Sequence, residues 1–156
     1  MLSHTAEYAL RSVLYIADRG EGEVVRAEEL AQAMDVPRNY LSKTLNQLAK
    51  FGVLHSVRGR NGGFSLGAAA HRISLLSIVE VFDPVQRKRT CLLGRSRCSD
   101  SNPCPAHERW KGISEQVVAF FRDTTVGDLL REPGKATRAL SSGGSLVDSR
   151  SRRRSG

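Results

Sequence analysis

The feature that most constrains the fold is a pair of short helical patterns separated by a proline-containing turn. Residues 26–34 and 39–51 carry apolar side chains at helical spacing. The segment DVPRN between them, residues 35–39, contains Pro37, and the residue before a proline is disfavoured in the helical region. Gly52 stands where a helix C-terminal stop is expected. The sequence therefore predicts a helix–turn–helix.

The hydrophobic period changes after the second helical pattern. Residues 53–59 and 63–67 are short and strand-like, and Asn61-Gly62 between them is a hairpin turn signal. A hairpin that follows a helix–turn–helix is typical of a winged helix. The predicted fold is therefore mainly α with a small β-hairpin wing. Apolar spacing predicts further helices over residues 3–18, 74–83, 105–123 and 125–132.

The charge of the helix–turn–helix region favours a polyanionic partner. The formal net charge is +8, and residues 36–79 contain Lys and Arg but no Asp or Glu. Solvated surfaces usually carry both positive and negative side chains, so binding to double-stranded DNA explains this acid-free stretch better than chance clustering. The early residues of a second helix reach base edges, lysines suit phosphates, and arginines on a wing suit the minor groove. The candidate DNA-binding residues are Arg38, Asn39, Tyr40, Ser42, Lys43, Lys50, Arg58, Arg60 and Asn61.

The predicted helix 105–123 carries an apolar stripe at near-heptad spacing. Its members are Trp110, Ile113, Val117, Phe120 and Phe121. Such a stripe either completes the core or packs on a second copy of the chain. We expect a homodimer, which would place two recognition helices about 34 Å apart on a pseudo-palindromic operator.

All three cysteines lie within a single segment, in the order Cys91, Cys98 and Cys104, and His107 follows. Thiolates bind soft metals and iron–sulfur clusters, and histidine can complete such a set. Cysteines in structural zinc sites usually stand about two to four residues apart, and the wider gaps here fit a larger inorganic core. From the residues alone, the order of preference is an iron–sulfur cluster, then zinc, then a thiol–disulfide switch. The predicted metal ligands are Cys91, Cys98, Cys104 and His107.

Three stretches together resemble one family. AEYALRSVLYIA, VPRNYLSKTLNQLAKFGVLHSVRGRNGGFSLG and the three-cysteine loop look like the iron–sulfur winged-helix regulators of the Rrf-two family, which includes IscR and NsrR, over about residues 1–132. The resemblance implies a homodimeric bacterial transcription factor, which we expect to be a repressor. It implies that the three cysteines bind a cluster near the dimer interface. We favour 2Fe–2S, with 4Fe–4S as the alternative. Cluster state would then alter DNA affinity in response to iron–sulfur status, oxidants or nitric oxide.

The resemblance also bears on the fourth cluster ligand. The segment CPAHERW is similar to the IscR pattern, which implies His107 as the ligand. The recognition helix and wing look closer to the NsrR branch, where a carboxylate near the N-terminus of the partner subunit can take that place, a position that Glu7 holds here. We favour His107 as the ligand, and a helix N-terminal dipole role for Glu7.

The chain divides into four predicted segments. These are a winged helix–turn–helix DNA-binding domain (1–83), a cysteine-rich cluster-binding loop (84–104), a dimerisation helix with a short C-terminal helix (105–132) and a disordered basic tail (133–156). No run is apolar enough to span a membrane and the N-terminus has no signal-peptide pattern, so we expect a cytoplasmic protein without a membrane partner.

No catalytic motif stands out, so we expect no enzyme. One alternative is a winged-helix regulator with a zinc or thiol-switch loop. A small electron-transfer protein is less favoured, because it would leave the basic wing unused.

Overall fold

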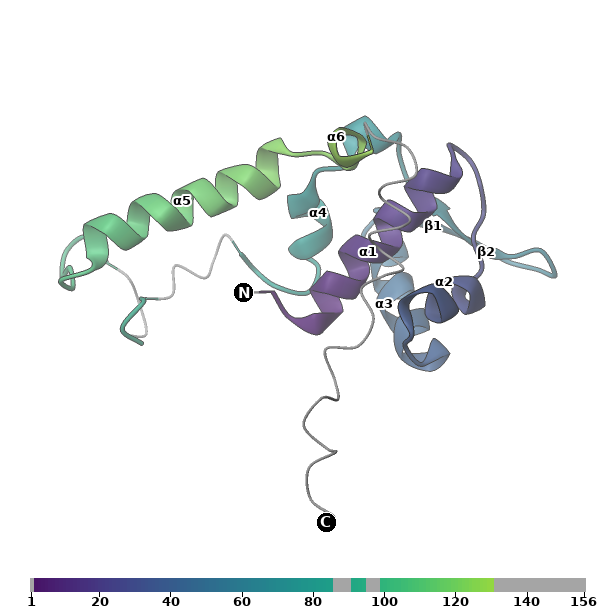
Figure 1. Ribbon diagram of the computed structural model, residues 1–156, viewed down its shortest axis with the longest axis horizontal. Helices are drawn as coiled ribbons and strands as arrows, with labels where there is room; N and C mark the ends of the chain where they lie inside the picture. The colour runs from purple at the N-terminus through teal and green to yellow at the C-terminus, as the bar shows by residue number, and fades with distance from the viewer. Residues whose placement is uncertain (1, 86–90, 95–98, 131–156) are drawn as a thin grey trace, which may run out of the picture.

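The computed structural model describes residues 2–85, 91–94 and 99–130. Figure 1 shows a body built from the N-terminal helices and a hairpin, with one long helix extending away from it as an arm. In chain order the elements are α1 (His4–Arg19), α2 (Ala27–Met34), α3 (Arg38–Lys50), β1 (Leu54–Val57), β2 (Gly63–Leu66), the 3-10 turn η1 (Ala70–Arg72), α4 (Leu75–Val79), α5 (His107–Asp123) and α6 (Val126–Leu129). Cys98 and the predicted tail 133–156 lie outside the described residues.

Local capping explains where several helices begin. Ser3 caps α1 by accepting a hydrogen bond from the Ala6 amide, and Ser74 does the same for α4 with Ser77. Thr125 and Asp128 form a reciprocal capping box at the start of α6. The predicted helix 74–83 is shorter than expected, because α4 ends at Val79. Pro84, five residues further along the chain, disfavours helical geometry at Asp83, the last residue of the predicted range.

The helix–turn–helix is confirmed by α2 and α3. Asp35 takes the left-handed conformation (φ 54°), which turns the chain between the two helices. Gly52 lies at φ 78° and ends α3 where the sequence predicts a stop. The inward faces meet α1 in one core, whose fully buried members include Ile16, Leu30, Leu41, Leu45 and Leu48.

The hairpin forms with Asn61-Gly62 inside its loop, but the first strand ends earlier than the predicted range 53–59. The last strand pair is Val57 with Gly63, so residues 58–62 form the loop. The positive φ falls on Gly59 (109°), and the Gly62 amide donates to the Gly59 carbonyl across 3.0 Å. A Cβ on Gly62 would run into the carbonyl oxygens of Val57 and Gly59, so glycine serves close backbone approach here.

Two further backbone bridges tie the ends of the body together. Val25, just before α2, exchanges two 2.9 Å hydrogen bonds with Phe64 of β2. Ser74, just before α4, forms a bridge with Thr125, just before α6. The bridge brings Val126 into the core, where it is fully buried. The segment after the arm therefore folds back onto the body.

The apolar stripe of α5 divides between two environments. Phe121 is 5% exposed and packs in the core, whereas Ile113 and Phe120 are 53% and 54% exposed. Figure 1 shows that α5 meets the body at its C-terminal end while its N-terminal end projects outward. In the part of the chain that the structure describes, no helix is long and apolar enough to cross a membrane.

Candidate DNA-binding surface and cysteine site

The outer face of α3 presents polar and basic side chains. Its inner face is made by Leu41, Leu45 and Leu48, which are fully buried. Asn39, Lys43 and Lys50 are exposed on the opposite side at helical spacing, so they share one face. Asn46, which sequence reasoning missed, is exposed and lies three residues beyond Lys43 and seven beyond Asn39. The same helical period could have found it.

Arg38 begins α3 and is held by an acid from α2. Its Nη1 lies 2.7 Å from Glu28 Oε1, across the turn of the helix–turn–helix. Both side chains remain exposed, at 63% and 55%. Because exposed ion pairs contribute about 0–1 kcal/mol, this pair orients Arg38 without trapping it. Ser42, a further predicted contact, is half-buried.

Tyr40 connects the start of α3 with the start of α1. Its hydroxyl lies 2.6 Å from Thr5 Oγ1, and its ring meets the Tyr8 ring edge-on at 6.1 Å between centroids. The Arg11 guanidinium lies over Tyr8 at 5.7 Å. The structure thus adds Thr5, Tyr8 and Arg11 of α1 to the surface around the recognition helix. Sequence reasoning had no local pattern that could pair residues so far apart in the chain.

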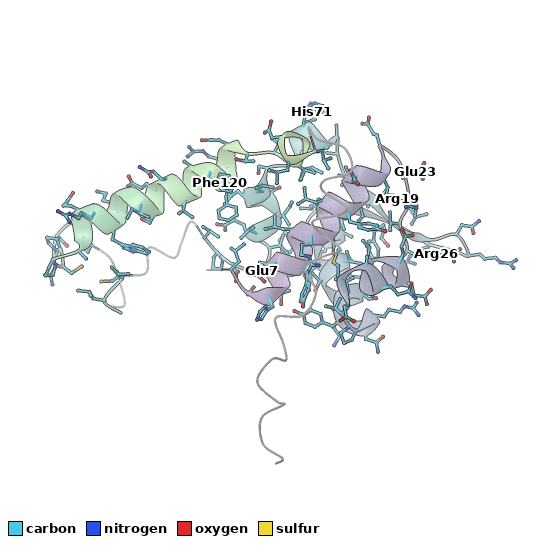
Figure 2. All side chains as sticks on the ribbon, in the orientation of Figure 1. Glu7, Arg19, Glu23, Arg26, His71 and Phe120 are labelled. Carbon is cyan, nitrogen blue, oxygen red and sulfur yellow. The ribbon has the colours of Figure 1, made fainter. Side chains whose placement is uncertain are left out.

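The wing carries the remaining predicted DNA contacts. Arg58, Arg60 and Asn61 are exposed in the loop between β1 and β2. Arg26 Nη2 donates to the Arg60 carbonyl oxygen across 3.5 Å, so a basic residue supports the wing from its base. Figure 2 shows Arg26 beside the hairpin.

The two cysteines that the structure describes, Cys91 and Cys104, come together. The Sγ atoms of Cys91 and Cys104 lie 3.7 Å apart, and the two residues are 4% and 8% exposed. A disulfide would need a separation of about 2.05 Å. Two sulfurs on one tetrahedral metal ion with bonds of about 2.3 Å would lie about 3.8 Å apart. The spacing of these two thiols matches that of two ligands on one metal ion, but among the described residues no group of three or more His, Cys, Asp or Glu side chains is arranged to hold one.

His107 follows Cys104 by three residues and begins α5. It is 3% exposed, and its amide donates to the Cys104 carbonyl across 2.9 Å. Cys104 stands three residues ahead of α5, which begins at His107 instead of at residue 105 as predicted. The ring Nε2 of His107 lies 2.8 Å from Asp100 Oδ1.

Asp100 was missed by sequence reasoning. The same Oδ1 atom also accepts a hydrogen bond from Lys111 Nζ at 2.9 Å. The hydrogen bonds from Lys111 and His107 lower the pKa of the Asp100 carboxyl to about 2. Its position as an acid within an otherwise basic loop could have drawn attention to it.

Glu7, the alternative ligand position, lies elsewhere in the chain. It is exposed in the first turn of α1, where its Oε2 is 3.4 Å from His4 Nδ1. Figure 2 shows Glu7 in the body, whereas the start of α5 lies at the far end of the arm. Within one chain, Glu7 and the cysteine segment are therefore far apart.

The comparisons with known proteins decide the family. Residues 2–132 match the Rrf2 family model, described as an iron-dependent transcriptional regulator. The chain belongs to the Rrf2 family. A protein of Aquifex aeolicus that carries the name of an HTH-type transcriptional regulator is 36% identical over 132 residues, which cover 83% of this chain and 91% of that protein. The HTH-type regulator IscR of Vibrio atlanticus is 28% identical over 131 residues, or 84% of this chain and 75% of that one.

Solved structures support the fold of this Rrf2-family regulator. CymR, the global cysteine regulator of B. subtilis, superposes with a TM-score of 0.69 at 22% identity, covering 83% of this chain and 95% of that chain. T. potens IscR gives 0.66 at 18% identity, with 83% and 85% covered. The predicted winged-helix fold and the predicted family are confirmed. The family model and the relatives carry the names of transcriptional regulators.

An apolar surface lies beside the cysteine site of this regulator. Leu92, Leu93 and Ile113 are 58%, 61% and 53% exposed. Together with Pro105 and Trp110 they line a shallow hollow of about 580 Å³ at the outer end of α5. Exposed apolar patches that are contiguous commonly mark an interaction surface.

Proposed function

We propose that this Rrf2-family regulator binds double-stranded DNA as a homodimer, and that an iron–sulfur cluster controls its DNA affinity. Cys91, Cys98 and Cys104 would hold the cluster with His107 as fourth ligand. The supporting observation is the pair of buried thiols 3.7 Å apart, with a buried histidine three residues after the second of them. When bound, the cluster supplies a reducible iron centre whose potential depends on ligands, hydrogen bonds and solvent exposure. We favour 2Fe–2S.

The DNA half of the proposal assigns separate roles to α3 and the wing. Asn39 and Arg38 would read base edges in the major groove, and Lys43 and Lys50 would contact phosphates. Arg58, Arg60 and Asn61 would lie along the minor groove. Tyr40 and Ser42, which lie closer to the body, would position the start of α3. Residues 1–83 are thus proposed as the DNA-binding unit.

The homodimer half is supported by the apolar surface of α5. Ile113 and Phe120 stay exposed on a helix that projects from the body, and Leu92 and Leu93 lie near its outer end. We propose that residues 105–132 form the dimer contact, which would hold two α3 helices at the spacing of one DNA turn. Residues 84–104 would then lie between the DNA-binding unit and this contact.

Anaerobic purification of the full chain tests the cluster. We expect a coloured protein with visible absorption, and Mössbauer spectroscopy would give the number of irons. Footprinting with the loaded and apo forms should show a protected pseudo-palindrome in only one of them, or much stronger protection in one. A colourless protein after anaerobic reconstitution with iron and sulfide would refute the cluster, while footprinting would still test DNA binding.

A thiol switch is a second candidate, and one observation favours it. Cys91 and Cys104 lie close enough that a small side-chain movement would bring their sulfurs to bonding distance. Oxidation of the anaerobic apo protein, followed by mass spectrometry, would show a loss of two hydrogens if this pair closes. Metal analysis of the same preparation distinguishes the cluster and the thiol switch from a structural zinc site.

A further inference from the structure

The ring of His107 is fixed by a chain of two polar contacts. Its side chain is 4% exposed, and Nε2 meets Asp100 Oδ1 at 2.8 Å. Lys111, one turn along α5 from His107, contacts the same oxygen at 2.9 Å. The loop acid is therefore held between two side chains of one helix face. Asp100 is 63% exposed, and these two contacts orient its carboxylate towards His107.

The ring nitrogen of His107 that faces Asp100 determines which tautomer the neutral ring adopts. A carboxylate is an acceptor, so the Nε2 that faces it carries the proton in the neutral ring. The lone pair of that ring then lies on Nδ1. Metal-bound histidines commonly donate their other N–H to a carboxylate, which fixes the tautomer and the ring orientation.

We propose that Asp100 is a positioning residue that holds His107 as the Nε2–H tautomer and makes Nδ1 the ligand atom. Lys111 keeps the Asp100 carboxylate in place. The ligand half of this inference rests on the proposed cluster site, whereas the tautomer half concerns the apo chain alone. If Asp100 only linked the loop to α5, it would not select one tautomer of His107.

The first test reads the tautomer directly. Long-range 15N–1H NMR of the full-length apo protein at pH 8 should show the His107 proton on Nε2, with the resonance assigned by a His107→Gln variant. In Asp100→Ala we expect the Nδ1–H form to rise to a substantial fraction. Asp123→Ala is the matched control, because Asp123 is an exposed α5 acid paired with Arg122 at 2.8 Å. A wild-type proton on Nδ1, or an unchanged tautomer in Asp100→Ala, would overturn the inference.

The second test measures ligand binding with Zn²⁺ alone as the probe. Loss of an outer-shell partner typically weakens metal binding by about 10–100-fold, and we expect that range for Asp100→Ala. Lys111→Gln should give a smaller loss, because Asp100 keeps its contact with His107. Wild-type Zn²⁺ affinity in Asp100→Ala would overturn the ligand half. If neither the wild type nor any variant takes up a cluster on reconstitution, the proposed function fails. The tautomer measurement still decides the role of Asp100 in that case.

Discussion

Thr5 on α1 and Tyr40 on α3 share a hydrogen bond of 2.6 Å between their hydroxyl oxygens. The bond fastens the first turn of the recognition helix to the first turn of α1. One residue ahead of α1, the Ser3 amide donates to Asp83 Oδ2 at 2.7 Å. Asp83 directly precedes the predicted cluster-binding loop, 84–104. The N-terminus of α1 therefore contacts both the recognition helix and the chain that leads to the cysteines.

This contact predicts how Tyr40 contributes to DNA binding. Tyr40→Phe keeps the ring against Tyr8 and removes the hydroxyl, so we expect a loss of about 0.5–1 kcal/mol in stability and a modest loss in DNA affinity. Thr5→Val should have a similar effect, and the double variant should be no worse than either single variant. Fluorescence anisotropy with an operator duplex measures all three. If Tyr40→Phe loses affinity while Thr5→Val does not, the hydroxyl contacts DNA directly.

The ion pair between Glu28 and Arg38 gives a second prediction. Glu28→Gln removes a negative charge next to the DNA-binding face and releases the Arg38 guanidinium. We expect tighter binding to DNA of any sequence and a smaller preference for the operator, with stability changed by less than about 1 kcal/mol. Titration of operator and random duplexes at several salt concentrations tests this. Unchanged affinity for both duplexes in Glu28→Gln would show that this ion pair does not influence DNA binding.

The basic residues of α3 and the wing can be tested by salt dependence. Lys43→Ala and Arg60→Ala should each weaken DNA binding and reduce the slope of log K against log salt by about 0.9, the value for one phosphate contact. The visible absorption of the reconstituted cluster should not change, because neither residue lies in the cysteine segment. Loss of that absorption in Arg60→Ala would mean that the wing and the cluster site are structurally linked.

The sequence predicted the features that depend on near neighbours. Gly52 as a helix stop is a local effect, and it is confirmed. The hairpin is confirmed, but its loop begins at Arg58 instead of after residue 59, and close backbone approach at Gly62 contributes to its shape. The contact of Thr5 with Tyr40 joins residues that are 35 positions apart, and the contact of Asp100 with Lys111 crosses from a loop to a helix. Such pairings depend on tertiary packing, which a periodic pattern does not encode.

Phe120 and Phe121 offer a test of the dimer that uses two adjacent residues. Phe121 is 5% exposed within the core, whereas Phe120 is 54% exposed, and their rings contact edge-on at 5.5 Å. Phe121→Ala should lower the free energy of unfolding by about 3–5 kcal/mol, because it leaves a cavity. Phe120→Ala should cost about 1 kcal/mol or less within one chain, the size of an aromatic contact.

The same two variants should rank in the opposite order for self-association. Phe120→Ala removes an exposed apolar side chain from the proposed dimer contact, so sedimentation velocity should show a larger monomer fraction than for wild type at equal concentration. Denaturation at low protein concentration isolates the effect of Phe121→Ala, since the stability of a dimer depends on concentration. If Phe120→Ala dimerises with the same dissociation constant as the wild type, the dimer contact lies on another face of the protein. Ile113→Ser, nearer the outer end of α5, would then show whether the dimer uses the hollow beside the cysteine segment.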